Sequence, residues 1–220
     1  MQPQSKSELY MLARITSNAQ AHIGRAAMIL DAHGISEQWA TAEHLGVATE
    51  MPDAYAYLNG WLTIPYLVRG SVRGIKFRCA EDHDHKEHGH GKYHSLGRTR
   101  IYGVDNLATD SSTFAICEGE LDALVMTHAL NIPAIGIPGV SAWHDHFDLL
   151  VDDYEDVIVV GDGDEPGREF SKRLAGRIRN AREVHVSNSK DVSECYALSG
   201  REYLQELIHG SRPVADHQVA

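Results

Sequence analysis

Carboxylates follow three apolar segments of this sequence. These acidic residues are Glu118 and Asp122 after FAIC, Asp162 and Asp164 after VIVVG, and Asp191 and Glu194 after VHVS. Two like charges as close as Asp162 and Asp164 repel each other unless a cation lies between them. Grouped carboxylate oxygens are the ligands that Mg²⁺ or Mn²⁺ prefers, with waters and substrate phosphates completing the shell. The acids therefore predict a divalent-metal site.

The segments around these acids alternate between strand and helix patterns. Apolar runs predict strands over residues 114–117, 134–138, 157–162 and 184–187, and helical spacing predicts helices over 121–130 and 167–180. Two short helices are expected after Asp191. Such alternation predicts a mainly parallel sheet with helices on its faces. Since the carboxyl ends of parallel strands share one edge, we expect the acids to converge on one cleft.

The first half of the chain has a different pattern. Residues from about 5 to 45 read as helical with a break at His33-Gly34, and the segments WLTIPYLV, GIKFRCA and KYHSL read as short strands. The predicted fold class is an α/β subdomain with a mainly parallel sheet, preceded by a smaller α+β subdomain. The expected boundaries are 1–110 for the α+β part, 111–210 for the α/β part and 211–220 for a frayed tail.

Positive charge collects in the strand region of the first half. The basic residues that alternate there with apolar ones are Arg69, Arg73, Lys76, Arg78, Lys92, Arg98 and Arg100. Because side chains alternate along a strand, Lys76 and Arg78 are expected to share one face. Two interpretations stay open for each: a contact to nucleic-acid phosphate, or the charged defence of an exposed edge strand.

Composition limits the classes of function. The formal net charge of −11 argues against a surface that is basic throughout, but not against a local basic groove. There is no apolar run near the ~20 residues that cross a bilayer and no signal-peptide pattern, so no membrane contact is expected and the cytoplasm is the expected location. The three cysteines form no CxxC pair, which disfavours a disulfide framework or a cysteine-rich zinc module.

A histidine-rich run stands between the last two strand segments of the first half. EDHDHKEHGHGK carries His83, His85, His88 and His90. Histidines at this density are able to bind Zn²⁺. The alternative, which we favour on sequence alone, is a polar loop inserted between the two strands.

The acidic segments also carry a family resemblance. CEGELDALVM, GDGDEPGREF and SKDVSECY resemble the three signature segments of the Toprim domain, which bacterial-type primases, type IA and II topoisomerases and some nucleases share. Upstream, HGIS…HLGV, IPY, KFR and KY occur in the order found in the N-terminal subdomain of the primase RNA-polymerase core, and they are most similar to phage and plasmid versions. The resemblance covers roughly residues 25–205.

The resemblance implies a DNA primase catalytic core that makes short RNA primers on single-stranded DNA from ribonucleoside triphosphates, with two or more Mg²⁺ or Mn²⁺ ions. It implies catalytic roles for Glu118, Asp162 and Asp164, and metal binding by these three with Asp122 and Asp191. The residues expected to contact nucleotide or nucleic acid are Lys76, Arg78, Lys92, Arg69, Arg73 and Lys190.

Other members of the wider group remain as alternatives. A Toprim-type metal-dependent nuclease would use the same acids, whereas a catalytically silent binding module is disfavoured because the acids are intact. A topoisomerase needs a tyrosine domain and a DNA gate, for which 220 residues leave no room. Full bacterial-type primases also carry a zinc ribbon and a helicase or helicase-binding domain. Neither is recognised in this sequence, so start-site choice is expected to come from a replicative helicase or a separate template-recognition protein, or to be relaxed. The alternative is that this chain supplies one part of a split primase.

Overall fold

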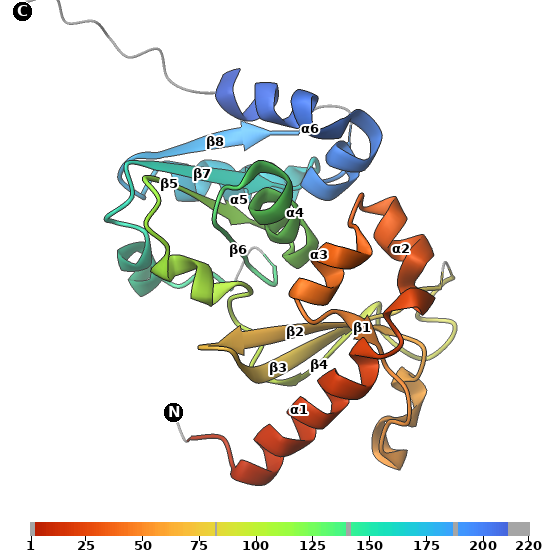
Figure 1. Cartoon of the computed structure of the whole chain (residues 1–220). Helices are drawn as coiled ribbons and strands as arrows, with labels where there is room; N and C mark the ends of the chain where they lie inside the picture. Colours follow the sequence, from red (N-terminus) through yellow and green to blue (C-terminus); the bar gives the residue numbers. More distant parts are fainter. Residues whose placement is uncertain (1–2, 82, 140–141, 187–188, 211–220) are drawn as a thin grey trace, which may run out of the picture.

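The computed structural model describes residues 3–81, 83–139, 142–186 and 189–210, so the tail predicted at 211–220 lies outside the described residues. Two sheets divide the chain, an antiparallel one in the first half and a parallel one in the second (Figure 1). No helix in the described ranges has the length and apolar character needed to cross a bilayer.

The first sheet is antiparallel, with four strands in chain order. Its strands are β1 (Gly46–Val47), β2 (Leu62–Val68), β3 (Ser71–Arg78) and β4 (Tyr93–Gly97). The helices of this half are α1 (Lys6–Gln20), η1 (Ile23–Ala26), α2 (Ala27–Ala32), α3 (Glu37–Ala42) and η2 (Asp53–Leu58). Helix α1 covers one face of the sheet, where Leu12 and Ile15 pack in one core cluster with Ile75 and Phe77 of β3. Lys76 and Arg78, which alternate with these two core residues, therefore face the second sheet.

The second sheet has strand order β6-β5-β7-β8 and every pairing in it is parallel. Its strands are β5 (Thr113–Cys117), β6 (Ala134–Gly136), β7 (Asp156–Gly161) and β8 (Ala181–His185). The other elements are η3 (Val104–Ala108), α4 (Glu120–Leu130), η4 (Asp145–Leu150), α5 (Glu165–Ala175) and α6 (Val192–Gly210). The predicted fold class is confirmed. The two short helices expected after Asp191 are both present: α6 consists of two helical segments that meet at a kink at Gly200, whose φ of 79° is not helical.

Helices cover both faces of the parallel sheet, which explains why β5, β6 and β7 are buried without alternation, whereas the edge strand β8 alternates between buried and exposed residues. Ala115 and Ile158 lie in the same core cluster as α4 and α6. Phe114 and Val159, which point to the opposite face, pack instead with Phe170 of α5. Because helices cover both faces, the acidic side chains gather at the carboxyl-terminal ends of the strands.

One continuous core joins the two halves of the chain. Ile64 of β2 and Leu45 belong to the same buried cluster as Leu124 of α4. The connecting segment adds a bridge, in which Tyr102 and Gly136 exchange backbone hydrogen bonds of 2.9 and 3.1 Å. This packing fixes the basic face of the first sheet relative to the acidic edge of the second.

Candidate active site

The strand order creates a crevice at the carboxyl ends of β5 and β7. The chain leaves β5 toward β6 on one side and returns to β7 on the other, so the switch of direction falls between two neighbouring strands. Ligands in open α/β sheets bind at such a point. Glu118 follows β5 and Asp162 follows β7, so both acids stand at the switch point.

Glu118 and Asp162 are in direct contact. The backbone N–H of Asp162 donates to Oε2 of Glu118 at 3.0 Å. Burial, and then the charge of Asp164, raise the pKa of Glu118 against the lowering effect of that hydrogen bond. Burial also raises the pKa of Asp162 to about 7, and Glu118 and Asp191 add to the rise. The pair is therefore a concentration of negative charge that a cation would relieve.

Glycines bring the Asp162–Asp164 turn close to its neighbours. A Cβ at Gly161 would lie 1.9 Å from the carbonyl oxygen of Gly167, and one at Gly163 would lie 2.6 Å from that of Ser189. Asp164 caps helix α5 by accepting the N–H of Gly167 at 2.9 Å. The sequence GDGDEPG thus folds into a tight turn that presents two carboxylates beside the loop after β8.

Ser193, in the third acidic segment, connects that segment to Asp122 of the first acidic segment. Its N–H donates to Oδ1 of Asp122 and its hydroxyl donates to Oδ1 of Asp191, both at 2.8 Å. Asp122 is buried, and burial followed by the charges of Asp191 and Asp162 raises its pKa well above the usual value. Asp122 therefore lies behind the site, where it holds the start of α6, while Asp191 lies at the surface of the cleft.

A cleft of about 890 Å³ brings acids and bases together. Asp162, Asp164 and Asp191 line it from the second sheet, and Arg78 and Lys92 line it from the first. Partial burial at the cleft wall, then Arg78 and Lys190, lower the pKa of the otherwise exposed Lys92, whereas Asp191 and Asp162 raise it. These opposing effects mean that the cations and the carboxylates face one another across the same space. Lys190, Arg168 and Tyr93 complete the polar part of the lining.

Three basic residues predicted to bind nucleic acid lie outside this cleft. Lys76 donates to both carboxylate oxygens of Glu120 at 2.7 and 2.9 Å and borders a separate hollow with Arg100. Arg73 lies near the beginning of β3 and borders another hollow, and Arg69 is exposed at the β2–β3 turn. Their role in nucleic-acid binding stays a prediction.

Two residues with strong contacts were missed in the sequence. Glu120 is buried and also accepts the hydroxyl hydrogen of Tyr66, although a glutamate in a helix first turn reads as solvent-exposed. His33, predicted only as a helix break, places Nδ1 2.7 Å from the hydroxyl oxygen of Ser193. Burial, followed by Arg78, lowers its pKa to about 4. Neither partner lies near in sequence, so no local pattern could have indicated either contact.

The acidic residues fit a divalent cation by their chemistry. Glu118, Asp162, Asp164 and Asp191 offer hard oxygen ligands, and burial raises the pKa of Glu118 and Asp162, a cost that a bound cation would offset. The cleft leaves space for waters and phosphates to complete a coordination shell. Within the described residues, the acids do not form a compact set of three ligand atoms; the one such set lies elsewhere, at Cys79.

Replacing Asp162 with asparagine should stabilise the magnesium-free protein at pH 8 by roughly 1–2 kcal/mol, after discounting for solvent screening. Below pH 3.8 the carboxyl is neutral in folded and unfolded chains alike. Between pH 3.8 and about 7 only the folded chain keeps the proton, so wild-type stability falls as pH rises, and the full penalty applies above that range. Urea denaturation of both proteins from pH 4 to pH 8 measures the difference.

The wild-type protein must be compared with Asp162→Asn because His33 changes the stability of the fold with pH in the opposite direction. Its lowered pKa makes the folded chain gain stability as pH rises, and this contribution is common to both proteins. A stability difference that does not change between pH 4 and pH 8 would contradict the raised pKa of Asp162.

Comparison with known proteins places these features in a class. Residues 115–196, which hold all three acidic segments, match the Toprim-like family. The fold of nearly the whole chain is that of a primase catalytic core. The RNA polymerase domain of Mycobacterium tuberculosis primase DnaG superposes with a TM-score of 0.74 at 18% identity, covering 93% of this chain and 84% of that one. A DnaG primase catalytic domain bound to single-stranded DNA gives a TM-score of 0.73 at 16% identity, covering 94% and 82%.

A closer relative in sequence comes from a phage. The chain is 35% identical over 157 residues to the gene 57 protein of Mycobacterium phage D29. The matched region covers 68% of this chain and 99% of the phage protein. The chain therefore belongs to the family of this phage protein, with a Toprim domain in its second half.

Proposed function

We propose that the chain is a DNA primase catalytic core, which makes short RNA primers on single-stranded DNA by metal-dependent nucleotidyl transfer. The observation that carries the proposal is the shared cleft, in which carboxylates from the ends of parallel strands face Arg78 and Lys92 from the other sheet. A growing primer, an incoming triphosphate and a template are all polyanions, and they need metal on one side and fixed cations on the other.

In the reaction, the 3′-hydroxyl oxygen of the growing primer loses its proton to water and bonds to the α-phosphorus of the incoming nucleotide, while the bond from that phosphorus to pyrophosphate breaks and pyrophosphate leaves. Mg²⁺ or Mn²⁺, when bound, supplies charge neutralisation and lowers the pKa of the attacking hydroxyl. Glu118, Asp162 and Asp164 are the proposed catalytic ligands, with Asp191 as a ligand for a further ion. Asp122, held by Ser193, keeps Asp191 in place from behind.

The basic residues of the cleft have a positioning role in this proposal. Arg78 and Lys92 stand at the adjoining ends of β3 and β4, and Lys190 stands beside Asp191 on the opposite wall. Contacts of such groups with phosphates hold a strand in register without reading its sequence. The structural likeness to a primase domain bound to single-stranded DNA supports a template path along this wall.

Three further points belong to the proposal. The subdomain boundaries are 1–110 and 111–210, and the place of action is the cytoplasm of a bacterial or phage-infected cell. The proposed protein partner is a replicative helicase or a separate template-recognition protein.

The proposal is tested by incubating the protein with labelled ribonucleoside triphosphates, Mg²⁺ or Mn²⁺ and single-stranded DNA, and by sizing the products. Oligoribonucleotides that require all three components are the expected result. Degraded template without synthesis would instead assign the cleft to the nuclease alternative. The Asp162→Asn protein, assayed in parallel, shows whether any product comes from this site.

A further inference from the structure

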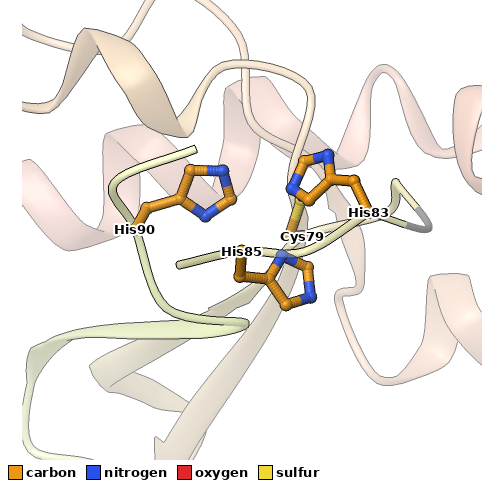
Figure 2. Close-up of side chains that lie close together, drawn as sticks. All are labelled: Cys79, His83, His85 and His90. Carbon is orange, nitrogen blue, oxygen red and sulfur yellow. The ribbon is translucent and has the colours of Figure 1, made fainter. Parts of the chain in front are cut away.

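A second cluster of metal-ligating side chains lies at the end of β3, apart from the acidic residues. One ligand atom from each of Cys79, His83, His85 and His90 lies within 4.8 Å of each of the others. Figure 2 shows the three imidazole rings gathered around the cysteine. Within the described residues, this is the one compact group of at least three such atoms.

The spacing of these atoms is close to that of tetrahedral zinc. Zn–S and Zn–N bonds of about 2.3 and 2.0–2.1 Å place neighbouring ligand atoms about 3.3–3.6 Å apart. Sγ of Cys79 and Nε2 of His83 are 3.8 Å apart, and the wider limit of the group is 4.8 Å. To bind zinc, the most distant of these ligand atoms must move about 1 Å closer together, and side-chain rotation in a loop allows this movement.

The outward-facing ring nitrogens are oriented as in zinc sites. Nδ1 of His83 lies 3.2 Å from a carboxylate oxygen of Glu81, and Nδ1 of His90 lies 3.0 Å from the carbonyl oxygen of Gly91. Such outer partners fix the tautomer and direct Nε2 toward a metal. Nδ1 of His85 is buried without a hydrogen-bond partner and points toward the cluster (Figure 2). A buried polar atom without a partner costs stability unless something binds it.

Burial within the run does not fit a simple polar loop. Lys86, Glu87 and His88 are exposed, as expected for solvated residues. His83, His85 and His90, by contrast, are half-buried and turn inward toward a buried cysteine. Three of the four histidines of this short segment thus face inward, whereas its described charged residues and His88 face water.

We propose that Cys79, His83, His85 and His90 bind one Zn²⁺ ion in a four-coordinate, structural site. Mixed sulfur and imidazole ligands select zinc over the hard cations suited to the acidic cleft. Cys79 binds as the thiolate, so its thiol proton is released to solvent when the metal binds. With four protein ligands, no position remains for substrate, and the ion acts on the fold.

The site would fix the loop that leads into the basic side of the cleft, where Arg78 and Lys92 lie. The N–H of Cys79 donates to the carbonyl oxygen of Lys92 at 3.0 Å, and Arg78 directly precedes Cys79. The ion would therefore close the loop between two residues that line the cleft. This inference concerns metal binding alone and stands whether or not the chain makes primers.

Elemental analysis of the full chain, purified without a histidine tag under reducing conditions, tests the proposal. About one zinc per chain is expected in the wild type, with loss in Cys79→Ser and in His83→Ala. The matched control is His88→Ala, because this ring stacks on His83 at 4.3 Å yet lies outside the four ligands. It should keep the wild-type zinc content.

Cobalt spectroscopy keeps the proposal testable if a variant fails to fold. Replacing the metal with Co²⁺ in the wild-type protein should give the intense visible bands of tetrahedral cobalt and a thiolate charge-transfer band in the near ultraviolet. Absence of zinc after reconstitution, weak octahedral cobalt bands, or equal loss in His88→Ala and His83→Ala would each overturn the site.

Discussion

Replacing Asp162 with asparagine is expected to lower the rate of primer synthesis by at least about 10²-fold, the usual loss when one electrostatic contact to the transition state is removed. The change keeps the size of the side chain and the glycine turn around it, and it removes a charge that interacts with Glu118 and Asp191. Affinity for divalent cations should fall with it. The measurement is the steady-state rate of labelled-nucleotide incorporation over a range of Mg²⁺ concentrations.

Asp164→Asn separates the catalytic role from the structural one. Asparagine caps helix N-termini as well as aspartate does, so helix α5 should keep its start while the charge is lost. The matched control is Glu169→Gln, an exposed acid on the same helix, which should leave the rate unchanged. Full activity in both aspartate variants would end the assignment of this cleft as a primase active site.

The acidic edge could be predicted from sequence because each strand is marked locally. VIVV and FAIC are apolar without alternation, as strands covered on both faces must be, and the acid follows each strand directly. Parallel geometry then brings Glu118 and Asp162 to one edge without further information. Strand β1 was missed because it has only two residues and depends on pairing with β2.

The contacts that could not be predicted join residues distant in the chain. Alternation correctly placed Lys76 on the face of Arg78, but its partner Glu120 stands 44 residues away on the other subdomain. A local pattern states which face a side chain occupies, not what lies opposite. The zinc cluster is an intermediate case. Its histidines are visible as a run, whereas Cys79 reads as the apolar end of a strand.

Replacing Lys76 with methionine is expected to lower the free energy of unfolding by about 3–5 kcal/mol, because it leaves the Glu120 carboxylate buried without its cation. The two side chains are only 13% and 6% exposed, so water cannot take the place of the ammonium group. Tyr66 still donates one hydrogen bond to Glu120, but it carries no charge. Urea denaturation at pH 7 measures the loss.

A double-mutant cycle decides whether Lys76 acts on the fold or on nucleic acid. Lys76→Met with Glu120→Gln should recover most of the lost stability, since no charge is then left buried. Lys92→Met is the matched control. Because Lys92 is exposed at the cleft, its loss should change stability by less than about 0.5 kcal/mol while weakening template binding. If Lys76→Met instead keeps wild-type stability and loses affinity for single-stranded DNA, the ion pair with Glu120 does not hold the subdomains together. Lys76 would then be the nucleic-acid contact that its sequence pattern predicts.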